Sequence, residues 1–498
     1  MHIVFITPAS ALRRFPVYRL GSRFYGHPNA ITGPLILGGI LKKAGHTAEV
    51  YEELNGKVPL KKCLEKADVF SLYTMTSTAP RAYELADIIH ASSDAKVIIG
   101  GIHASALPEE AAAHADHVIV GEGESVILDV VEGRLTDKII RTSPPEDLDA
   151  LPLPDYSILK TPCDCANIMT TRGCTCRCSF CTTSRMFAPY RQRSVDSVIE
   201  EIRLYKKMGF RYMNFEDDNF TADKERAKEI CRRMIAENLT FKETFFFGRT
   251  DMAEDEELMG LLKKAHLNRV LIGIESLNEK ALEQIHKGQN RDDILRAAKS
   301  CREHKIRLIA SLVLGIDADT KEDIRRAVQF AADLDAYQLQ PAILTPYPGA
   351  LTFQQFQKEE RMLVPDWEQY DMMNTTFIPK NLTPWELQDE FYHAVTKFYS
   401  FSSAFRIGRL FGRGYAVRRL GLWFFAHLGA FGARFASRFA KGTFYYKLRH
   451  GIYEESWKDA APVLYSLQNN IPVTQLEDAL DDSETASELQ WQKEQLIS

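Results

Sequence analysis

The stretch "TTRGCTCRCSFCTTSRMF" (170–187) holds four of the nine cysteines of the chain. Cys174, Cys178 and Cys181 have the spacing C-x3-C-x2-C, and Cys176 lies inside the first gap. Three thiolates on one short loop do not complete a structural zinc site, which needs four ligands, commonly as two separated pairs. They can hold three irons of a four-iron cluster and leave the fourth iron open. The spacing therefore favours an iron–sulfur site with one free coordination position.

Charged side chains follow several short apolar runs farther along the chain. Three acids close one run: Glu216, Asp217 and Asp218. They could bind a cation, or they could cap a following helix. Arg249 could face an anion or form an ion pair with Asp251. Glu275 ends an apolar run, and a buried carboxylate there needs a partner, which favours a function.

The elements that position these residues start with a βα series over the first ~135 residues. Helical patterns at 34–45 and 79–91 separate apolar runs, which lie at 2–8, 47–52, 69–76, 96–101 and 117–124. This alternation predicts a doubly wound, Rossmann-like parallel sheet. Ligands of such sheets lie at the carboxyl ends of the strands.

The expected strand ends of this first domain carry small and polar residues. The candidates for binding a large ligand are Thr76, Ser77, Gly100, Gly101, His103, Gly121, Glu122 and Gly123. Glycine lets a backbone approach a ligand closely. Glycines after strands are also found in simple tight turns, so the pattern alone leaves both interpretations open.

A second βα series follows a linker that is rich in Pro and Asp. We expect a first domain over 1–140, the linker over 141–160 and a partial (β/α)6 TIM-type barrel over 161–353. The expected barrel strands are 166–171, 212–217, 244–249, 269–276, 307–315 and 337–344. Ser197 and Glu200, in the helical pattern 194–209, are spaced as a capping box. The cysteine stretch follows the first strand, at the face of the barrel that carries the chemistry.

The remaining residues predict a mostly helical C-terminal region over 354–476 and a flexible acidic tail over 477–498. Residues 391–453 contain no Asp or Glu but eleven Lys or Arg, and they are rich in aromatic residues. They suit either a helix on an anionic membrane surface or a helical cap with its arginines extended to water. A basic aromatic pocket for a tetrapyrrole or lipid is a further interpretation. The uncharged run 420–433 is too short to span a bilayer.

Composition sets outer limits on these interpretations. The 498 residues predict two or three domains, and the net charge of −5 gives no indication of a nucleic-acid partner. The start "MHIVFITPAS" lacks a signal-peptide pattern, so we expect a cytoplasmic protein, with peripheral membrane contact as an alternative. An odd, uneven set of cysteines indicates metal binding or catalysis. Cys63, Cys231 and Cys301 suit a core, whereas Cys163 and Cys165 are free thiols or a second metal site.

Several motifs together resemble one known family. "RGCTCRCSFC" resembles the cluster loop of the radical S-adenosylmethionine superfamily, C-x3-C-x-aromatic-C, with Phe180 as the aromatic residue. "FEDDNFT" (215–221), "IGIES" (272–276) and "TPYPG" (345–349) resemble strand motifs of that superfamily. "GGIHAS" (100–105) and "VGEGE" (120–124) resemble the cobalamin-type domain of its members related to the anaerobic magnesium-protoporphyrin monomethyl ester cyclase. The resemblance covers roughly residues 1–353.

The resemblance implies a role for each matched residue. Cys174, Cys178 and Cys181 would ligate a four-iron, four-sulfur cluster whose open iron chelates S-adenosylmethionine. Phe180 would lie against this cofactor, and Glu216, Asp217 or Asp218 would hold its ammonium group. Arg249 would face its carboxylate, and Glu275 would accept from its ribose hydroxyls. The cofactor would give a 5′-deoxyadenosyl radical that abstracts hydrogen from an unactivated carbon. The small and polar residues at the expected strand ends of the first domain would hold cobalamin.

The expected function is an enzyme that methylates or oxidises a hydrophobic substrate, such as a tetrapyrrole, hopanoid or lipid. No catalytic residue is assigned. A one-electron donor such as flavodoxin or ferredoxin would be a partner. The chain lacks the D-x-H-x-x-G motif that supplies a histidine to cobalt, so cobalamin either binds without it or has been lost. The alternatives are a cobalamin-independent cyclase, oxidase or coupling enzyme and, in another class, an iron–sulfur or corrinoid carrier or sensor.

Overall fold

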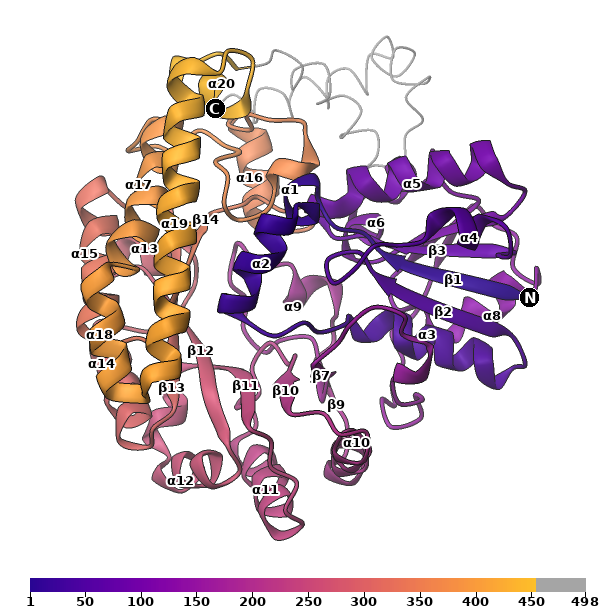
Figure 1. Ribbon diagram of the computed structural model, residues 1–498, viewed down its shortest axis with the longest axis horizontal. Helices are drawn as coiled ribbons and strands as arrows, with labels where there is room; N and C mark the ends of the chain where they lie inside the picture. The colour runs from indigo at the N-terminus through magenta and orange to yellow at the C-terminus, as the bar shows by residue number, and fades with distance from the viewer. Residues whose placement is uncertain (454–498) are drawn as a thin grey trace, which may run out of the picture.

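The computed structural model describes residues 1–453 of the chain. The expected acidic tail at 477–498 and the last part of the expected 354–476 region lie outside the described residues. Within residues 1–453, two parallel six-stranded sheets and a C-terminal group of helices confirm the α/β class that the sequence predicts (Figure 1).

The N-terminal sheet has the strand order β2-β1-β3-β4-β5-β6. Its strands are β1 (His2–Thr7), β2 (Thr47–Glu52), β3 (Val69–Tyr73), β4 (Lys96–Gly100), β5 (His117–Val120) and β6 (Ile139–Arg141). The sequence predicted all of these except β6. Strand order reverses between β1 and β3, and parallel sheets bind ligands in the crevice at such a point.

Helices cover both faces of this sheet. They include α3 (Thr32–Lys43), α4 (Leu60–Leu64), α5 (Ala79–Ser92), α6 (Ile102–Ala106), α7 (Pro108–Ala112) and α8 (Ile127–Val131). Alternate residues of β1 enter different cores: Ile3 and Phe5 pack on the α3 side, whereas Val4 and Ile6 pack on the α5 side. This period of two, buried on both sides, produces the continuous apolar runs of the sequence.

The second sheet is the predicted partial barrel, with its six strands in sequential order. They are β7 (Cys165–Ile168), β10 (Tyr212–Phe215), β11 (Glu243–Gly248), β12 (Leu267–Glu275), β13 (Arg307–Leu314) and β14 (Gln338–Ile343). The main helices outside it are α10 (Val195–Lys207), α11 (Lys224–Ala236), α12 (Glu256–Lys264), α14 (Arg291–Glu303) and α15 (Lys321–Asp333). β7 and β14 are the two edges of the sheet, so the barrel is open between them.

Two helix caps differ from those that the sequence suggested. The predicted box at Ser197 and Glu200 is wrong, because α10 begins earlier, with Ser194 accepting a hydrogen bond from the Ser197 amide at 3.1 Å. The acids at 216–218 do not cap α11 either, since its N-cap is Asp223. Those acids are therefore free of that structural role.

The C-terminal region is helical, as predicted. It contains α16 (Leu351–Lys358), α17 (Pro384–Phe398), α18 (Phe401–Phe411), α19 (Arg413–Phe439) and α20 (Phe444–His450). The uncharged run 420–433 is the middle of the 27-residue helix α19. Within residues 1–453 no helix is long and apolar enough to cross a membrane.

Two N-terminal helices escaped the sequence analysis. α1 (Ala11–Arg14) and α2 (Pro16–Tyr25) leave the first sheet after β1 and cross to the C-terminal helices, where α2 lies beside α19 (Figure 1). Short α9 (Thr183–Met186), which follows the cysteines, lies between the two sheets in the same view (Figure 1).

Candidate active site

The cysteine loop leaves the barrel directly after β7 and is closed by a short antiparallel pair, β8 (Thr171–Arg172) with β9 (Arg191–Gln192). Asp217 fixes the start of the loop. Its buried carboxylate accepts hydrogen bonds from the Thr170 amide at 2.6 Å, the Thr171 amide at 2.9 Å and the Thr170 hydroxyl at 2.5 Å. Asp217 thus holds β10 against the loop, and its oxygens are already occupied.

The loop itself is held in shape by its carbonyl groups. Arg185 donates to the carbonyl of Cys178 at 3.2 Å and to that of Cys181 at 2.8 Å. The Ser179 amide donates to the Ile285 carbonyl at 3.2 Å, which ties the loop to the region after β12. Protein partners thus satisfy three peptide groups of the loop without using the cysteine thiols.

All nine cysteines are free thiols. Within residues 1–453, no three His, Cys, Asp or Glu side chains converge closely enough to hold a single metal ion. Each cysteine of a four-iron cluster binds a different iron, so its ligands need not converge on one point. Cys174 donates a hydrogen bond to Cys176, which lowers the pKa of Cys176 to about 6 and raises that of Cys174. Burial also raises the pKa of Cys178, so the structure favours the thiolate form at Cys176 rather than at Cys174 or Cys178.

Glu216 and Asp218 flank Asp217 and have different surroundings. Burial, followed by repulsion from Asp217 and Asp218, raises the pKa of Glu216 to about 7. Its carboxylate has no hydrogen-bond or ion-pair partner among residues 1–453. Asp218 is exposed at the mouth of the barrel, yet desolvation by the surrounding chain still raises its pKa to about 6. A ligand cation would stabilise both in the charged form.

The end of β12 holds a buried ion pair that sequence reasoning missed. Lys287 donates to Glu275 Oε1 at 2.6 Å, and both side chains are buried. Glu275 has a positive φ of 63°, which turns its side chain back over the strand end. A Cβ on Gly273 would lie 2.1 Å from Glu275 Oε1 and 2.3 Å from Lys287 Nζ, so only glycine leaves room for the pair.

Two buried acceptors beside this pair lack a protein partner. They are Glu275 Oε2 and Gln289 Oε1, whereas Gln289 Nε2 donates to the Gly273 carbonyl at 2.7 Å. Buried acceptors without a partner cost free energy, and ligand hydroxyl groups would satisfy them. The residues present therefore fit the nucleoside end of S-adenosylmethionine.

Arg249 reaches the same region from the end of β11. It donates to the Lys287 carbonyl at 2.7 Å, and it forms no ion pair within residues 1–453. The suggested pair with Asp251 is wrong, because Asp251 pairs with Lys224 at 3.4 Å. The guanidinium thus keeps donors for an anionic ligand group.

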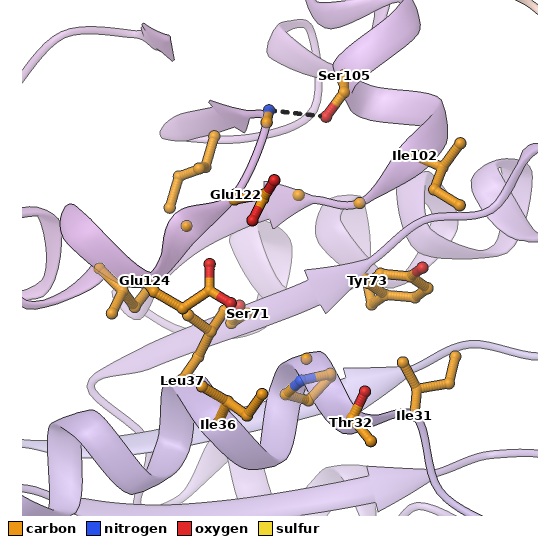
Figure 2. Close-up of a pocket in the computed structure, with 18 of the residues that line it drawn as sticks. Ile31, Thr32, Ile36, Leu37, Ser71, Tyr73, Ile102, Ser105, Glu122 and Glu124 are labelled. Atoms are coloured by element: carbon orange, nitrogen blue, oxygen red, sulfur yellow. Dashed lines mark hydrogen bonds between the residues drawn. The ribbon is translucent and has the colours of Figure 1, made fainter. Parts of the chain in front are cut away.

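A cleft opens at the carboxyl end of the first sheet, at its switch point (Figure 2). The cleft is open to solvent and is lined mostly by apolar groups. The predicted residues that line it are Gly100, Gly101, Gly121, Glu122 and Gly123. Figure 2 shows Ser105 on its rim, where the hydroxyl accepts from the Gly121 amide at 3.0 Å.

The glycines serve both of the roles that the sequence left open. Gly101 (φ +106°) and Gly121 (φ +95°) need to be glycine for the turns themselves, since a Cβ would lie 2.6 Å from Thr74 O and from Thr142 Oγ1 respectively. At Gly33, another lining residue, a Cβ would meet nothing within 4 Å, so the missing side chain leaves the cleft open.

Three predicted cofactor residues, Thr76, Ser77 and His103, are not among the lining residues. His103 is fully buried, with Nε2 3.1 Å from Glu110 Oε1 and its ring against Trp367. The lining contains no histidine, in agreement with the missing D-x-H-x-x-G motif.

The cysteine loop forms part of the wall of this cleft. Met169, Arg172, Met186 and Phe187, which lie on either side of the cysteines, line it together with the glycine turns. Glu122 also lines it, but its carboxylate accepts from Arg172 and Arg191. A ligand in the cleft would therefore touch both the first domain and the cysteine loop.

Of the remaining thiols, Cys63, Cys231 and Cys301 are buried core residues of helices, as predicted. Cys163 donates to the Cys165 carbonyl at 3.2 Å. In the described part of the chain, these two cysteines belong to no group of three side chains that could hold a metal ion.

Comparisons with known proteins agree with this arrangement. The radical SAM superfamily model matches residues 168–331, and the B12 binding domain model matches residues 23–131. The chain thus contains a radical SAM domain preceded by a B12 binding domain, and it is an enzyme of the radical SAM type. Its cofactors are a four-iron, four-sulfur cluster, S-adenosylmethionine and cobalamin.

Among curated proteins, the chain is similar to the bacteriochlorophyllide d C-12(1)-methyltransferase of Chlorobaculum tepidum, with 28% identity over 68% of this chain and 75% of the relative. It is 25% identical to the anaerobic magnesium-protoporphyrin IX monomethyl ester cyclase of Cereibacter sphaeroides over 73% and 66% of the two chains. The radical S-adenosylmethionine methyltransferase TsrM of Kitasatospora setae shares the fold, with a TM-score of 0.60, 16% identity and coverage of 86% and 99%.

Proposed function

We propose that this enzyme uses cobalamin and a radical derived from S-adenosylmethionine to methylate an unactivated carbon of a hydrophobic substrate. One observation carries the proposal: the cleft of the B12 binding domain and the cysteine loop share a wall through Met169, Arg172, Met186 and Phe187. A methyl group carried in that cleft would be next to the place where the radical forms. A tetrapyrrole is the substrate class that the two named relatives favour, with hopanoids and lipids as alternatives.

The cluster would be held by Cys174, Cys178 and Cys181, with the fourth iron left for S-adenosylmethionine. When bound, the reduced cluster supplies the electron that splits S-adenosylmethionine to a 5′-deoxyadenosyl radical, and cobalamin serves as the methyl carrier. The protein positions these groups and excludes water. We expect Cys176 to tune the loop without ligating, because its neighbours supply the three required thiolates.

The amino-acid end of S-adenosylmethionine would meet Glu216, Asp218 and Arg249. Glu216 has no other partner and would accept from the ammonium group. Arg249 would donate to the carboxylate. We do not propose Asp217 as a partner of the ammonium group, because the peptide groups of Thr170 and Thr171 already occupy its oxygens. Phe180 would pack against the cofactor.

The ribose end would meet the strand end of β12. Glu275 Oε2 and Gln289 Oε1 are the acceptors without protein partners there. Lys287 would hold Glu275 in place through their 2.6 Å contact. In the first domain, the turns at Gly100–Gly101 and Gly121–Gly123 would lie against cobalamin, with no histidine ligand from the lining.

Two partner proposals accompany the reaction. A flavodoxin or ferredoxin would supply the electron that the cluster needs. We also propose peripheral membrane contact through residues 391–453.

The decisive experiment is anaerobic. The protein is reconstituted with iron, sulfide and hydroxocobalamin, reduced, and given S-adenosylmethionine labelled with deuterium in its methyl group together with candidate tetrapyrroles. We expect 5′-deoxyadenosine, S-adenosylhomocysteine and a labelled methyl group on the substrate. Cys174→Ala, Cys178→Ala and Cys181→Ala should each abolish the products, whereas Cys176→Ala serves as the matched control and should keep them.

Other outcomes identify the alternatives. Deoxyadenosine with an oxidised, unmethylated product would favour a cyclase or oxidase. Corrinoid and cluster absorbance with no S-adenosylmethionine cleavage on any substrate would favour a carrier or sensor and contradict the proposal.

A further inference from the structure

The outer side of α19 is an exposed apolar stripe. Its members are Val417 (61% exposed), Phe424 (53%), Leu428 (47%), Phe431 (70%), Phe435 (54%) and Phe439 (66%). Their spacing of seven, four, three, four and four residues puts them on one face of the helix. The buried residues Ala430, Ala433 and Ser437 lie on the opposite face. The helix therefore packs on the protein with small residues and presents its large ones to the outside.

A second helix, far away in sequence, extends this stripe. α2 lies beside α19, with the rings of Phe24 and Phe425 5.8 Å apart (Figure 1). A Cβ on Gly421 would lie 2.3 Å from Phe24, so the two helices meet closely. The exposed apolar residues of α1, of α2 and of the residue between them are Leu12 (51%), Phe15 (62%), Val17 (58%) and Leu20 (55%). We call the stripe of α19 together with these four residues the α2–α19 face.

The barrel holds α2 in place. The Tyr25 hydroxyl donates to Gln340 at 3.0 Å, and Gln338 donates to the Tyr25 carbonyl at 3.0 Å. Both glutamines belong to β14. These hydrogen bonds hold α2 against β14, so this part of the α2–α19 face is an ordered surface of the protein.

The two chain segments that form this face carry positive charge only. Residues 1–48 and 391–453 contain no Asp or Glu. Arg23, Arg409, Arg413 and Arg438 are exposed and form no ion pair within residues 1–453. Single exposed apolar residues are ordinary, but a continuous apolar row with free arginines beside it marks an interaction site. We therefore expect the partner of the α2–α19 face to have an apolar interior and an anionic surface.

A lipid membrane has this combination of properties. The stripe from Val417 to Phe439 is about 33 Å long on a straight helix, which suits a helix lying in the plane of a membrane. No helix of residues 1–453 could cross a bilayer, so the contact would be with one surface only. We propose that the α2–α19 face binds the surface of an anionic lipid membrane, with its aromatic side chains at the headgroup–acyl boundary and its arginines on lipid phosphates.

This inference goes beyond the contact suggested for residues 391–453. It adds the N-terminal helix α2, and it excludes several basic residues of the C-terminal segment. Arg419 is buried and donates to the carbonyls of Tyr337 and Phe398, and Arg434 pairs with Asp389 at 2.7 Å. The inference does not depend on the reaction that the enzyme performs.

Flotation of the full-length protein with vesicles tests the proposal. We expect binding to phosphatidylglycerol vesicles at low salt and weaker binding at high salt or to phosphatidylcholine vesicles. Phe424→Ser/Phe431→Ser/Phe435→Ser and, separately, Phe15→Ser/Val17→Ser/Leu20→Ser should each lower the partition coefficient about tenfold or more. The matched control is Met208→Ser/Ile88→Ser/Leu295→Ser, three exposed apolar residues on other elements, which should bind like wild type.

A fourth variant tests the charge. Arg409→Gln/Arg413→Gln/Arg438→Gln should weaken binding at low salt and flatten the salt dependence. Unchanged cluster absorbance and thermal unfolding would show that each variant is folded.

The proposal is overturned if wild type does not float with anionic vesicles at low salt, or if both apolar variants float as well as the control. It is equally overturned if wild type is a dimer that the apolar variants turn into a monomer without any vesicle binding, because the face would then pair two copies of the chain.

Discussion

At the scale of single residues, the three acids after β10 divide their work by environment. The carboxylate of Asp217 accepts three hydrogen bonds, Asp218 is exposed at the mouth of the barrel, and Glu216 is half-buried without a partner among residues 1–453. The three neighbouring carboxylates thus divide into one structural anchor, Asp217, and two candidate ligands, Glu216 and Asp218. Only the Thr170 and Thr171 amides, which lie far from Asp217 in sequence, decide which acid is the anchor.

Glu216 makes the binding of S-adenosylmethionine depend on pH. Its pKa is raised to about 7, so the carboxyl is protonated below that pH and ionised above it. Because the ionised form attracts the ammonium group, we expect the dissociation constant to fall as pH rises from 6 to about 7.5. Equilibrium dialysis of the reconstituted protein would measure it.

The variant Glu216→Gln distinguishes the effect of Glu216 from that of other groups that titrate nearby. Glu216→Gln should bind more weakly and lose the dependence over that range. The same raised pKa also costs stability, since the folded state binds the extra proton between about pH 4.5 and 7, and the free energy of unfolding should fall as pH rises through that window. A Glu216→Gln variant with the wild-type pH profile would contradict the assignment.

Lys287 is the second residue whose role can be tested alone. Its removal leaves the Glu275 carboxylate buried without its cation and no longer fixed in position. We expect Lys287→Met to weaken S-adenosylmethionine binding at least about tenfold while the cluster absorbance persists. Lys280→Met, an exposed lysine in the preceding helix α13 (Glu279–Gln284), is the control and should bind normally. Equal binding by both variants would remove Lys287 from the site.

At the scale of elements, the sequence predicted the strands well and their ends poorly. The runs 69–76, 117–124 and 166–171 end at Tyr73, Val120 and Ile168 in the structure. The residues that follow these strand ends belong to the loops after each strand, where the chain leaves the sheet. Helices α1 and α2 were missed for a related reason: they lie on the surface, and α2 buries no residue completely, so no core pattern indicated them.

The turn after β4 allows steric and conformational costs to be separated. Gly101 has a positive φ, and a Cβ there would also lie 2.6 Å from the Thr74 carbonyl oxygen. Gly133 has a positive φ of 73° but open space around it. We expect Gly133→Ala to lower the free energy of unfolding by about 1 kcal/mol and Gly101→Ala by about 3 kcal/mol. Chemical denaturation would measure both, and equal losses would show that the contact with Thr74 is relaxed at little cost.

At the scale of the whole molecule, two domains meet through a buried ionic network. Arg172 of the cysteine loop donates to Glu122 and, at 2.6 Å, to Glu124 of the B12 binding domain. Arg191 donates to the same Glu122 and, at 2.8 Å, to the Pro145 carbonyl. The sequence indicated Glu122 as a cofactor residue, but it could not show this use, because the arginines lie about 50 and 70 residues away. The network fixes the cleft wall two residues before Cys174.

Loss of this network should affect the two cofactors differently. Arg172→Leu leaves two buried carboxylates without one of their cations, and removing one partner of a buried pair is far more costly than its contact suggests. The B12 binding domain would then lose its position against the loop, while the cysteines and their carbonyl contacts with Arg185 stay intact. We therefore expect corrinoid retention after gel filtration to drop at least about tenfold, with cluster absorbance unchanged.

The matched control is Arg134→Leu. Arg134 also bridges two carboxylates, Asp129 and Glu132, but it is 51% exposed and belongs to one domain only. Because exposed pairs contribute little, this control should retain corrinoid like wild type. Equal corrinoid retention by the two variants would mean that the domains hold their cofactors independently of each other.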